Sequence, residues 1–375
     1  MATAAIDRPV EASAAYATSS AAARLVSLDV FRGITMASMV MVNNQTAGSY
    51  DQLRHSSWHG WTFTDMVFPF FLWIVGVAMT LSTARRLERG EKKPDLIRHA
   101  FIRFALIFAV GLFMNGFPNF DLGTYRILGV LQRIAICYLI ATLIYLYTDV
   151  RGRVIAAVGC IAIYTALMHP GGYGQGTNLS NWIDGVVLGP HNYANSKTWD
   201  PEGFLSTLPS ISTCLLGVLT GDLLRASMSM AEKAAWMLFS GNVLFFAAQI
   251  FNVFQPINKP IWTGSYAVLM AGLALMVFGS CYWLIDVRGH RNGWTRPFII
   301  FGMNAMAVYV FHELVSILFS SWHVSADVTA RKALIAFFAG MADQAGAVLL
   351  YSLVHVATSF VFAYALYRRQ WFLRF

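Results

Sequence analysis

Two histidines and an aspartate stand beside a strongly apolar run of residues. They are His55, His59 and Asp65, in the stretch "RHSSWHGWTFTDMVFPFFLWIVG" that covers residues 54–76. Histidine suits proton transfer near neutral pH because its unperturbed pKa is about 6.5. A nearby carboxylate can fix the tautomer of such an imidazole. The residue types therefore indicate general base catalysis, with a histidine as the base and Asp65 as its orienting partner.

The two histidines are also spaced for metal binding, because residues four apart share one face of a helix. However, the stretch lacks the glutamate of a HExxH motif, and Gly60 favours a turn. We therefore expect no metal at His55 and His59.

Further polar side chains interrupt apolar runs, where a charge costs roughly 2.5–3.5 kcal/mol at mid-bilayer. Asp29 and Arg32 are three residues apart and could neutralise each other. Arg133 needs an anionic partner, for which Asp65 and Glu313 are the candidates. Each of these polar residues, considered alone, could simply form a structural hydrogen bond. Considered together, polar residues in the outer halves of the predicted spans are expected to line one cavity. These residues are Asn43, Asp65, Arg133, His312 and Glu313, with Asn304 about two turns deeper.

The composition indicates what must position these groups. Of 375 residues, 57% are hydrophobic and 12% charged, whereas a soluble domain has about 25% charged residues. The net charge of +8 does not indicate nucleic acid, because the basic residues lie between apolar runs and do not cluster on a soluble face. All four cysteines fall in apolar stretches and are expected to be packing residues. The partner of this chain is therefore a lipid bilayer.

Apolar stretches of about 20 residues predict an all-α, polytopic membrane protein with about ten spans. The predicted spans are 27–47, 64–84, 97–117, 126–147, 153–169, 204–224, 233–253, 262–285, 297–319 and 345–367. Residues 321–343 contain "ALIAFFAG", too short to span, which leaves open an eleventh or re-entrant segment. Residues 1–24 are expected to be a disordered Ala/Ser-rich tail, and residues 25–375 one membrane domain.

Lysine and arginine residues set the expected orientation. They are concentrated after the even-numbered spans, as in "ARRLERGEKKPDLIRH", residues 84–99, so these ends and both termini are expected in the cytoplasm. His55 then faces outward, together with the long loop 169–203 and the turn "PINKPIW". Trp58 in this outer region suits either sugar recognition or the interfacial aromatic belt.

Two further local patterns have more than one reading. "DPEG" reads as a helix start with Asp200 as the N-cap, although Glu202 could also pair with a sugar ammonium. Gly217 and Gly221 in "GVLTG" form a small-xxx-small pattern, which suits close helix packing or a homodimer.

Six blocks, in this order, resemble the transmembrane heparan-α-glucosaminide N-acetyltransferase family and its bacterial homologues. They are "SLDVFRGITMASMVMVNN", "HSSWHGWTFTDMVFPFFLWIVG", "GVLQRIA", "DPEGFLSTLPSISTCLLGVLTG", "NKPIWTGSYAV" and "GMNAMAVYVFHE". The resemblance implies a multi-pass protein of a bacterial inner membrane. It implies transfer of an acetyl group from cytosolic acetyl-CoA to the amine of a glucosamine-type sugar on the far side.

The resemblance also distinguishes the two histidines. His55 matches the family's catalytic histidine, and Asn43 and Asp65 match its companions, whereas His59 stands where the family usually has asparagine. His55 is thus the expected base or transient acetyl carrier, Asp65 its orienting group and Asn43 a donor to the oxyanion. A ping-pong route and direct transfer would use the same residues.

The phosphates of CoA cannot cross lipid, so the donor must extend from the cytoplasmic ends to the outer cavity. The expected phosphate partners are Arg32, Arg85, Arg86 and Arg103, and the alternative is that they only reflect the positive-inside bias. Two other functions stay open: a secondary transporter of sugars or cell-wall fragments, and a membrane O-acyltransferase of polysaccharides.

Overall fold

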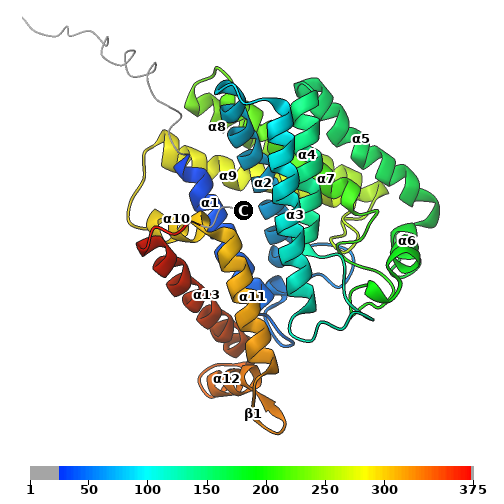
Figure 1. Ribbon diagram of the computed structural model, residues 1–375, viewed down its shortest axis with the longest axis vertical. Coiled ribbons are helices and arrows are strands. Elements are labelled where there is room, and N and C mark those ends of the chain that lie inside the picture. Colours follow the sequence, from blue (N-terminus) through cyan, green and yellow to red (C-terminus); the bar gives the residue numbers. More distant parts are fainter. Residues whose placement is uncertain (1–24, 373–375) are drawn as a thin grey trace, which may run out of the picture.

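The computed structural model describes residues 25–372, and these residues are almost entirely helical (Figure 1). The expected tail, residues 1–24, lies outside the described part. The longer helices are α1 (Val26–Asn43), α2 (Phe63–Glu88), α3 (Lys93–Gly116), α4 (Val130–Tyr147), α5 (Val150–Met168), α7 (Thr207–Arg225), α8 (Met230–Phe254), α9 (Gly264–Tyr282), α11 (Ala305–Ser321) and α13 (Gln344–Arg368). The shorter elements are α6 (Leu179–Leu188), α10 (Thr295–Met303), α12 (Ala330–Ala339), the 3-10 turns η1 (Asp51–Leu53), η2 (His169–Gly171) and η3 (Gly189–His191), the π-helical turn η4 (Trp283–Val287), and strands β1 (His323–Ser325) and β2 (Val328–Thr329).

Within residues 25–372, eight helices are long and apolar enough to cross a membrane, which confirms the all-α, polytopic fold. They are α2, α3, α4, α5, α7, α8, α9 and α13. The ninth predicted span is a bent pair of helices, and the first forms α1, which is not one of the eight. Eight of the ten predicted spans are thus confirmed as straight helices, and the ninth is a broken one.

Helices α2, α4, α7 and α9 bury most of their apolar surface, whereas α3, α5 and α8 leave most of theirs exposed. The centre of the protein contains α2 packed on α7. A Cβ atom on Gly217 would lie 2.1 Å from the Trp73 carbonyl oxygen, and one on Gly76 would lie 2.0 Å from the Cys214 carbonyl oxygen. The glycines of "GVLTG" therefore let α7 approach α2 within one chain, and a homodimer would need another surface. All four cysteines are free, as expected for packing residues.

The predicted span 297–319 breaks at Asn304, where α10 and α11 meet at 84°. Helix α10 lies against α1 with almost no space between the backbones. A Cβ atom on Gly33 would lie 1.8 Å from the Phe298 carbonyl oxygen, and one on Gly302 would lie 2.2 Å from the Asp29 carbonyl oxygen. Only glycine permits this approach, which fixes α10 across α1 before the chain turns into α11.

Residues 321–343 form the β1–β2 hairpin and the ten-residue α12, which project beyond the ends of α11 and α13 (Figure 1). At 1.5 Å per residue α12 is about 15 Å long. It is therefore too short to be an eleventh span. The long loop before α7 is also ordered locally, because it contains α6 and two 3-10 turns.

Candidate active site

Asp65 is held at the start of α2 by a capping box. Thr62 is the N-cap, and its backbone N–H donates to Asp65 Oδ2 at 3.0 Å, while the Ser56 N–H donates to the same oxygen at 3.1 Å. The other oxygen, Oδ1, lies 2.6 Å from His55 Nδ1. Because a carboxylate only accepts, Nδ1 carries the proton of this bond. His55 Nε2 is therefore the ring nitrogen that can accept a proton.

The burial of the two partners differs sharply. The Asp65 side chain is fully buried, whereas the His55 side chain is 54% exposed. The positive charge of Lys259 lowers the pKa of His55, desolvation acts in the same direction, and the bond to Asp65 opposes both. The ring is thus held neutral near pH 7, which is the form that accepts a proton.

Lys259 is brought to this place by a second loop that pairs with the first. The Gly60 N–H donates to the Ile257 carbonyl at 2.8 Å, and Gly60 forms an isolated parallel bridge with Asn258. His59 belongs to this contact and not to the Asp65 site, because its Nδ1 lies 3.4 Å from Asn258 Nδ2. Within residues 25–372 no group of three or more His, Cys, Asp or Glu side chains is arranged for a metal ion.

Trp58 follows His55 by three residues and lies between two loops. Its Nε1–H donates to the Tyr173 carbonyl at 2.8 Å, and its ring meets Trp199 edge to face, with 5.3 Å between centroids. The indole thus fixes the loop before α6 against the loop after η1, and part of it stays exposed.

The expected helix start at Asp200 is wrong, because α7 begins only at Thr207. Asp200 instead forms a two-pronged ion pair with Arg126, at 2.8 Å to Nε and 2.6 Å to Nη2. Nη2 of Arg126 also lies 2.6 Å from Glu202, and its guanidinium stacks on Tyr193 at 4.6 Å. The local sequence does not indicate that Arg126 belongs to the site. Its only signal is a positive charge just before α4, on the side of the membrane where few positive charges are expected.

The expected carboxylate partner of Arg133 is also not found. Its guanidinium is buried, donates to the Gly203 carbonyl at 3.0 Å and to the Ser206 hydroxyl, and lies over the Trp262 ring at 5.1 Å. Neither Asp65 nor Glu313 forms an ion pair with it among the described residues. Nη2 of Arg133 thus joins α4 to the start of α7, whereas Nε and Nη1 are buried without a hydrogen-bond partner among the described residues.

Asn43, His312 and Glu313 meet in a second polar cluster, where the end of α1 faces the middle of α11. Asn43 Nδ2 donates to Glu313 Oε1 at 2.9 Å and lies 3.4 Å from His312 Nε2. His312 is fully buried and Glu313 is 28% exposed. Asn304 does not belong to this cluster, because it forms the bend between α10 and α11. Among the described residues, no hydrogen bond or ion pair joins the His55–Asp65 pair, the Asn43 cluster and the Arg133 contact to one another.

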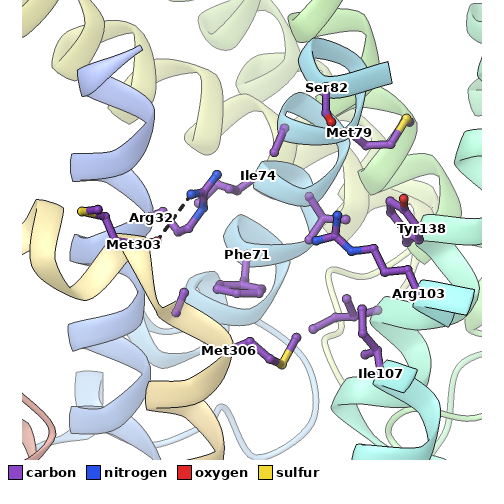
Figure 2. Close-up of a pocket in the computed structure, with 15 residues that line it drawn as sticks. Arg32, Phe71, Ile74, Met79, Ser82, Arg103, Ile107, Tyr138, Met303 and Met306 are labelled. Atoms are coloured by element: carbon purple, nitrogen blue, oxygen red, sulfur yellow. Dashed lines mark hydrogen bonds between the residues drawn. The ribbon is translucent and has the colours of Figure 1, made fainter. Parts of the chain in front are cut away.

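At the opposite end of the helices, the four predicted phosphate partners line two adjoining cavities. The outermost cavity, about 420 Å³, is bordered by Arg32, Arg85 and Arg86, and the next, about 310 Å³, by Arg32 and Arg103. Arg32 and Arg103 reach into the second cavity from opposite sides, from α1 and α3 (Figure 2). Both cavities share Ser82, so they adjoin.

The arginines of these cavities differ in how far they are engaged. Arg32 lies 3.3 Å from Asp29, as predicted, and donates to the Gly302 carbonyl at 3.4 Å (Figure 2). Arg86 pairs with Glu91 at 2.7 Å. Arg103 lies over the Tyr138 ring at 4.8 Å, and its Nε finds no hydrogen-bond partner among the described residues. A basic mouth followed by an apolar shaft suits a ligand with phosphates at one end and a thin arm at the other.

Comparisons with known proteins identify the family of this chain. A family model described as "Heparan-alpha-glucosaminide N-acetyltransferase, catalytic" matches residues 24–256, well over half of the chain. The heparan-alpha-glucosaminide N-acetyltransferase of Mus musculus is 27% identical over 417 residues, covering 94% of this chain and 61% of the relative. That of Homo sapiens is 29% identical over 354 residues, covering 78% and 53%. The chain thus spans less than two thirds of the length of these relatives. It belongs to the heparan-alpha-glucosaminide N-acetyltransferase family.

Proposed function

We propose that this protein is a multi-pass membrane enzyme that transfers the acetyl group of acetyl-CoA to the amine of a glucosamine-type sugar, with His55 as the general base. The observation that carries the proposal is the 2.6 Å contact between His55 Nδ1 and the buried Asp65 carboxylate. This contact leaves Nε2 of an exposed, neutral imidazole free to take a proton. An amino sugar is largely protonated at neutral pH, so the attacking amine needs such a base.

Asp65 holds the ring and stabilises the imidazolium that forms when Nε2 takes the proton. Asn43 is the proposed donor to the oxyanion. Its Nδ2 donates to Glu313 in this structure, so this role requires the acetyl carbonyl to displace the Glu313 carboxylate. Oxyanion donors of this kind lower the activation barrier by about 2.7–4 kcal/mol.

The acceptor sugar is proposed to lie over His55, with Trp58 as an apolar face and Glu202 near its ammonium. His312 and Glu313 form the wall on the side of α11, and Arg133 and Asn304 fix the helices behind that wall. The donor lies in the basic cavities, with its phosphates near Arg32, Arg85, Arg86 and Arg103 and its thioester toward Asn43. No metal is required by this chemistry.

Acetyl-CoA is proposed to bind from the cytoplasm and the sugar from the outside of a bacterial inner membrane, with both termini in the cytoplasm. A cysteine introduced at Ser57, in an otherwise cysteine-free protein, should react with an impermeant thiol reagent added to the outer face of intact spheroplasts. Reaction only after permeabilisation would overturn this orientation.

Product analysis tests the proposed reaction itself. Purified protein with acetyl-CoA and glucosamine should form N-acetylglucosamine and free CoA in equal amounts. O-acetyl product would favour a polysaccharide O-acyltransferase. A burst of CoA release without acceptor would indicate transient acetylation of His55, and its absence would indicate direct transfer.

The break between α10 and α11 gives a second candidate function its specific support, because broken spans line the substrate sites of many secondary transporters. A transporter would accumulate labelled sugar in proteoliposomes without acetyl-CoA. The acetyltransferase should show no such uptake and should consume acetyl-CoA instead.

A further inference from the structure

A polar row on α13 has no part in the proposed chemistry. Tyr351, His355 and Ser359 are four residues apart, so they share one face of the helix, and each is at most 2% exposed. The Tyr351 hydroxyl, both ring nitrogens of His355 and the Ser359 hydroxyl have no hydrogen-bond partner among residues 25–372. Buried polar groups in native proteins are almost always satisfied by protein or by ordered water. This row is therefore expected to bind water.

The row leads to the Asn43 cluster. His355 and Tyr351 have ring centroids 4.7 Å apart, and His355 lies near enough to His312 on α11 for their charges to interact. His312 Nδ1 is likewise buried without a partner among the described residues, while its Nε2 is 3.5 Å from Glu313. Phe319 closes the far side of His355. Ionisable groups in such a series inside a membrane are typical of proton relays.

Tyr309 connects this series to the donor cavities. Its ring meets His312 edge to face at 5.2 Å, and it lies beside Glu313. It also lines a third, narrow cavity of about 10 Å³, which shares Phe71, Ile134 and Met306 with the 310 Å³ cavity that contains Arg103.

This narrow cavity is otherwise apolar, and flexible methionines border it, among them Met36 and Met39. Met306 and Phe71 lie close to each other at the lower end of the cavity that Arg103 enters (Figure 2). A pantetheine arm extended from the basic cavities would part these methionine side chains and bring its sulfur next to Tyr309. Tyr309 is the one ionisable side chain in the lining of this constriction.

We propose that Tyr309 donates the proton that the CoA sulfur takes when the thioester is cleaved, and that water bound along the His312–His355 row returns a proton to Tyr309. This inference rests on the proposed acetyltransferase function. The amine nitrogen bonds to the thioester carbonyl carbon, the carbon–sulfur bond breaks, and its electron pair goes to sulfur, which takes the Tyr309 hydroxyl proton. The amine proton leaves through His55. Tyr309 regains its proton through the neighbouring Glu313, which is recharged from His312 and the water of the row. A bare thiolate in this apolar lining would be strongly disfavoured.

The decisive variant is Tyr309→Phe, which keeps the ring and removes the proton. Single-turnover CoA release should fall at least 100-fold, as is usual for the loss of an acid catalyst, while the Kd for acetyl-CoA stays within threefold of the native value. The native enzyme should show a solvent deuterium isotope effect above 2 on this step. Tyr364→Phe, on the exposed face of α13, is the matched control and should behave as the native enzyme does.

Native-like CoA release by Tyr309→Phe with intact acetyl-CoA binding would overturn the proton donor. A native protein that releases no CoA would instead refute the underlying acetyltransferase function, so the two failures are distinguishable.

Hydration of the row has its own test. His355→Phe should lower the melting temperature and slow CoA release about tenfold if water joins His355 to His312. A higher melting temperature would mean that the imidazole is buried dry, and it would overturn the water path.

Discussion

His55 Nδ1 and Asp65 Oδ1 lie 2.6 Å apart, and Asp65 Oδ2 accepts from the Ser56 and Thr62 backbone amides. The carboxylate therefore cannot turn away from the imidazole without losing its own bonds. An exposed histidine is given a fixed orientation by a buried group that also starts a membrane-spanning helix. The orientation of the His55 ring and the capping of α2 thus depend on the same side chain.

Asp65→Asn separates these two tasks. An asparagine oxygen can still accept the capping bonds, but its amide stabilises the imidazolium far less and can select the wrong tautomer of His55. We expect kcat to fall about 10²- to 10⁴-fold while the melting temperature changes by only a few degrees. CoA release and thermal melting of the same preparation measure both. Near-native kcat would show that Asp65 only caps α2.

Lys259→Gln removes the positive charge that lowers the pKa of His55. The pKa of His55 should then rise, so the imidazole becomes protonated at a higher pH and can no longer accept a proton there. The acidic limb of the kcat/KM profile should therefore move to higher pH, with the rate at high pH little changed. Lys332→Gln, on exposed α12, is the control. An unmoved or lowered limb would show that Lys259 does not set the charge state of His55.

Arg126→Gln should destabilise the protein strongly. The substitution leaves the Asp200 and Glu202 carboxylates buried without their cation, and the loss of one partner of a buried pair costs about 3–5 kcal/mol. Arg54→Gln is the matched control, because its pair with Asp51 is exposed and should contribute less than about 1 kcal/mol. Thermal melting in detergent compares the two. Equal melting temperatures would contradict a structural role of the Arg126 pair.

Arg103→Gln tests whether the cavity arginines bind CoA or only reflect topology. Its guanidinium has no carboxylate partner among the described residues and stacks on Tyr138. The loss should raise the Kd for acetyl-CoA about tenfold, equivalent to about 1.4 kcal/mol, and flatten the salt dependence of binding. Arg151→Gln, exposed at the start of α5, should leave Kd unchanged. If Arg103→Gln and Arg151→Gln bind acetyl-CoA with the same Kd, the positive-inside bias alone explains the presence of Arg103.

The sequence predicted the parts of this site that are local. His55 and Asp65 are ten residues apart at a helix start, so their pairing follows from the chain between them. Arg126, Asp200 and Glu202 are joined across more than 70 residues, and nothing in the local sequence announces that contact. The "DPEG" pattern suggested a helix start because Asp200 satisfies a nearby backbone N–H, but that N–H belongs to a turn at Glu202.

The membrane spans were predictable from apolar length, whereas the break at Asn304 was not. Its cause is the contact of Gly33 and Gly302 with the backbone of the neighbouring helix, and hydropathy does not register such a contact. The choice of hydrogen-bond partners among the polar groups has the same origin. Their depths could be estimated, but which helix faces which depends on packing.

The central claim is tested most directly by CoA release from purified protein with acetyl-CoA and glucosamine, compared between the native enzyme, His55→Ala and His59→Ala. His55→Ala should lose at least 100-fold in turnover while its Kd for acetyl-CoA stays near the native value, because the ring is the base and does not reach the donor's phosphates. His59→Ala should keep turnover within about threefold. Near-native turnover by His55→Ala would contradict the assignment of His55 as the base. Loss of activity in His59→Ala alone would show that His59 is the base instead.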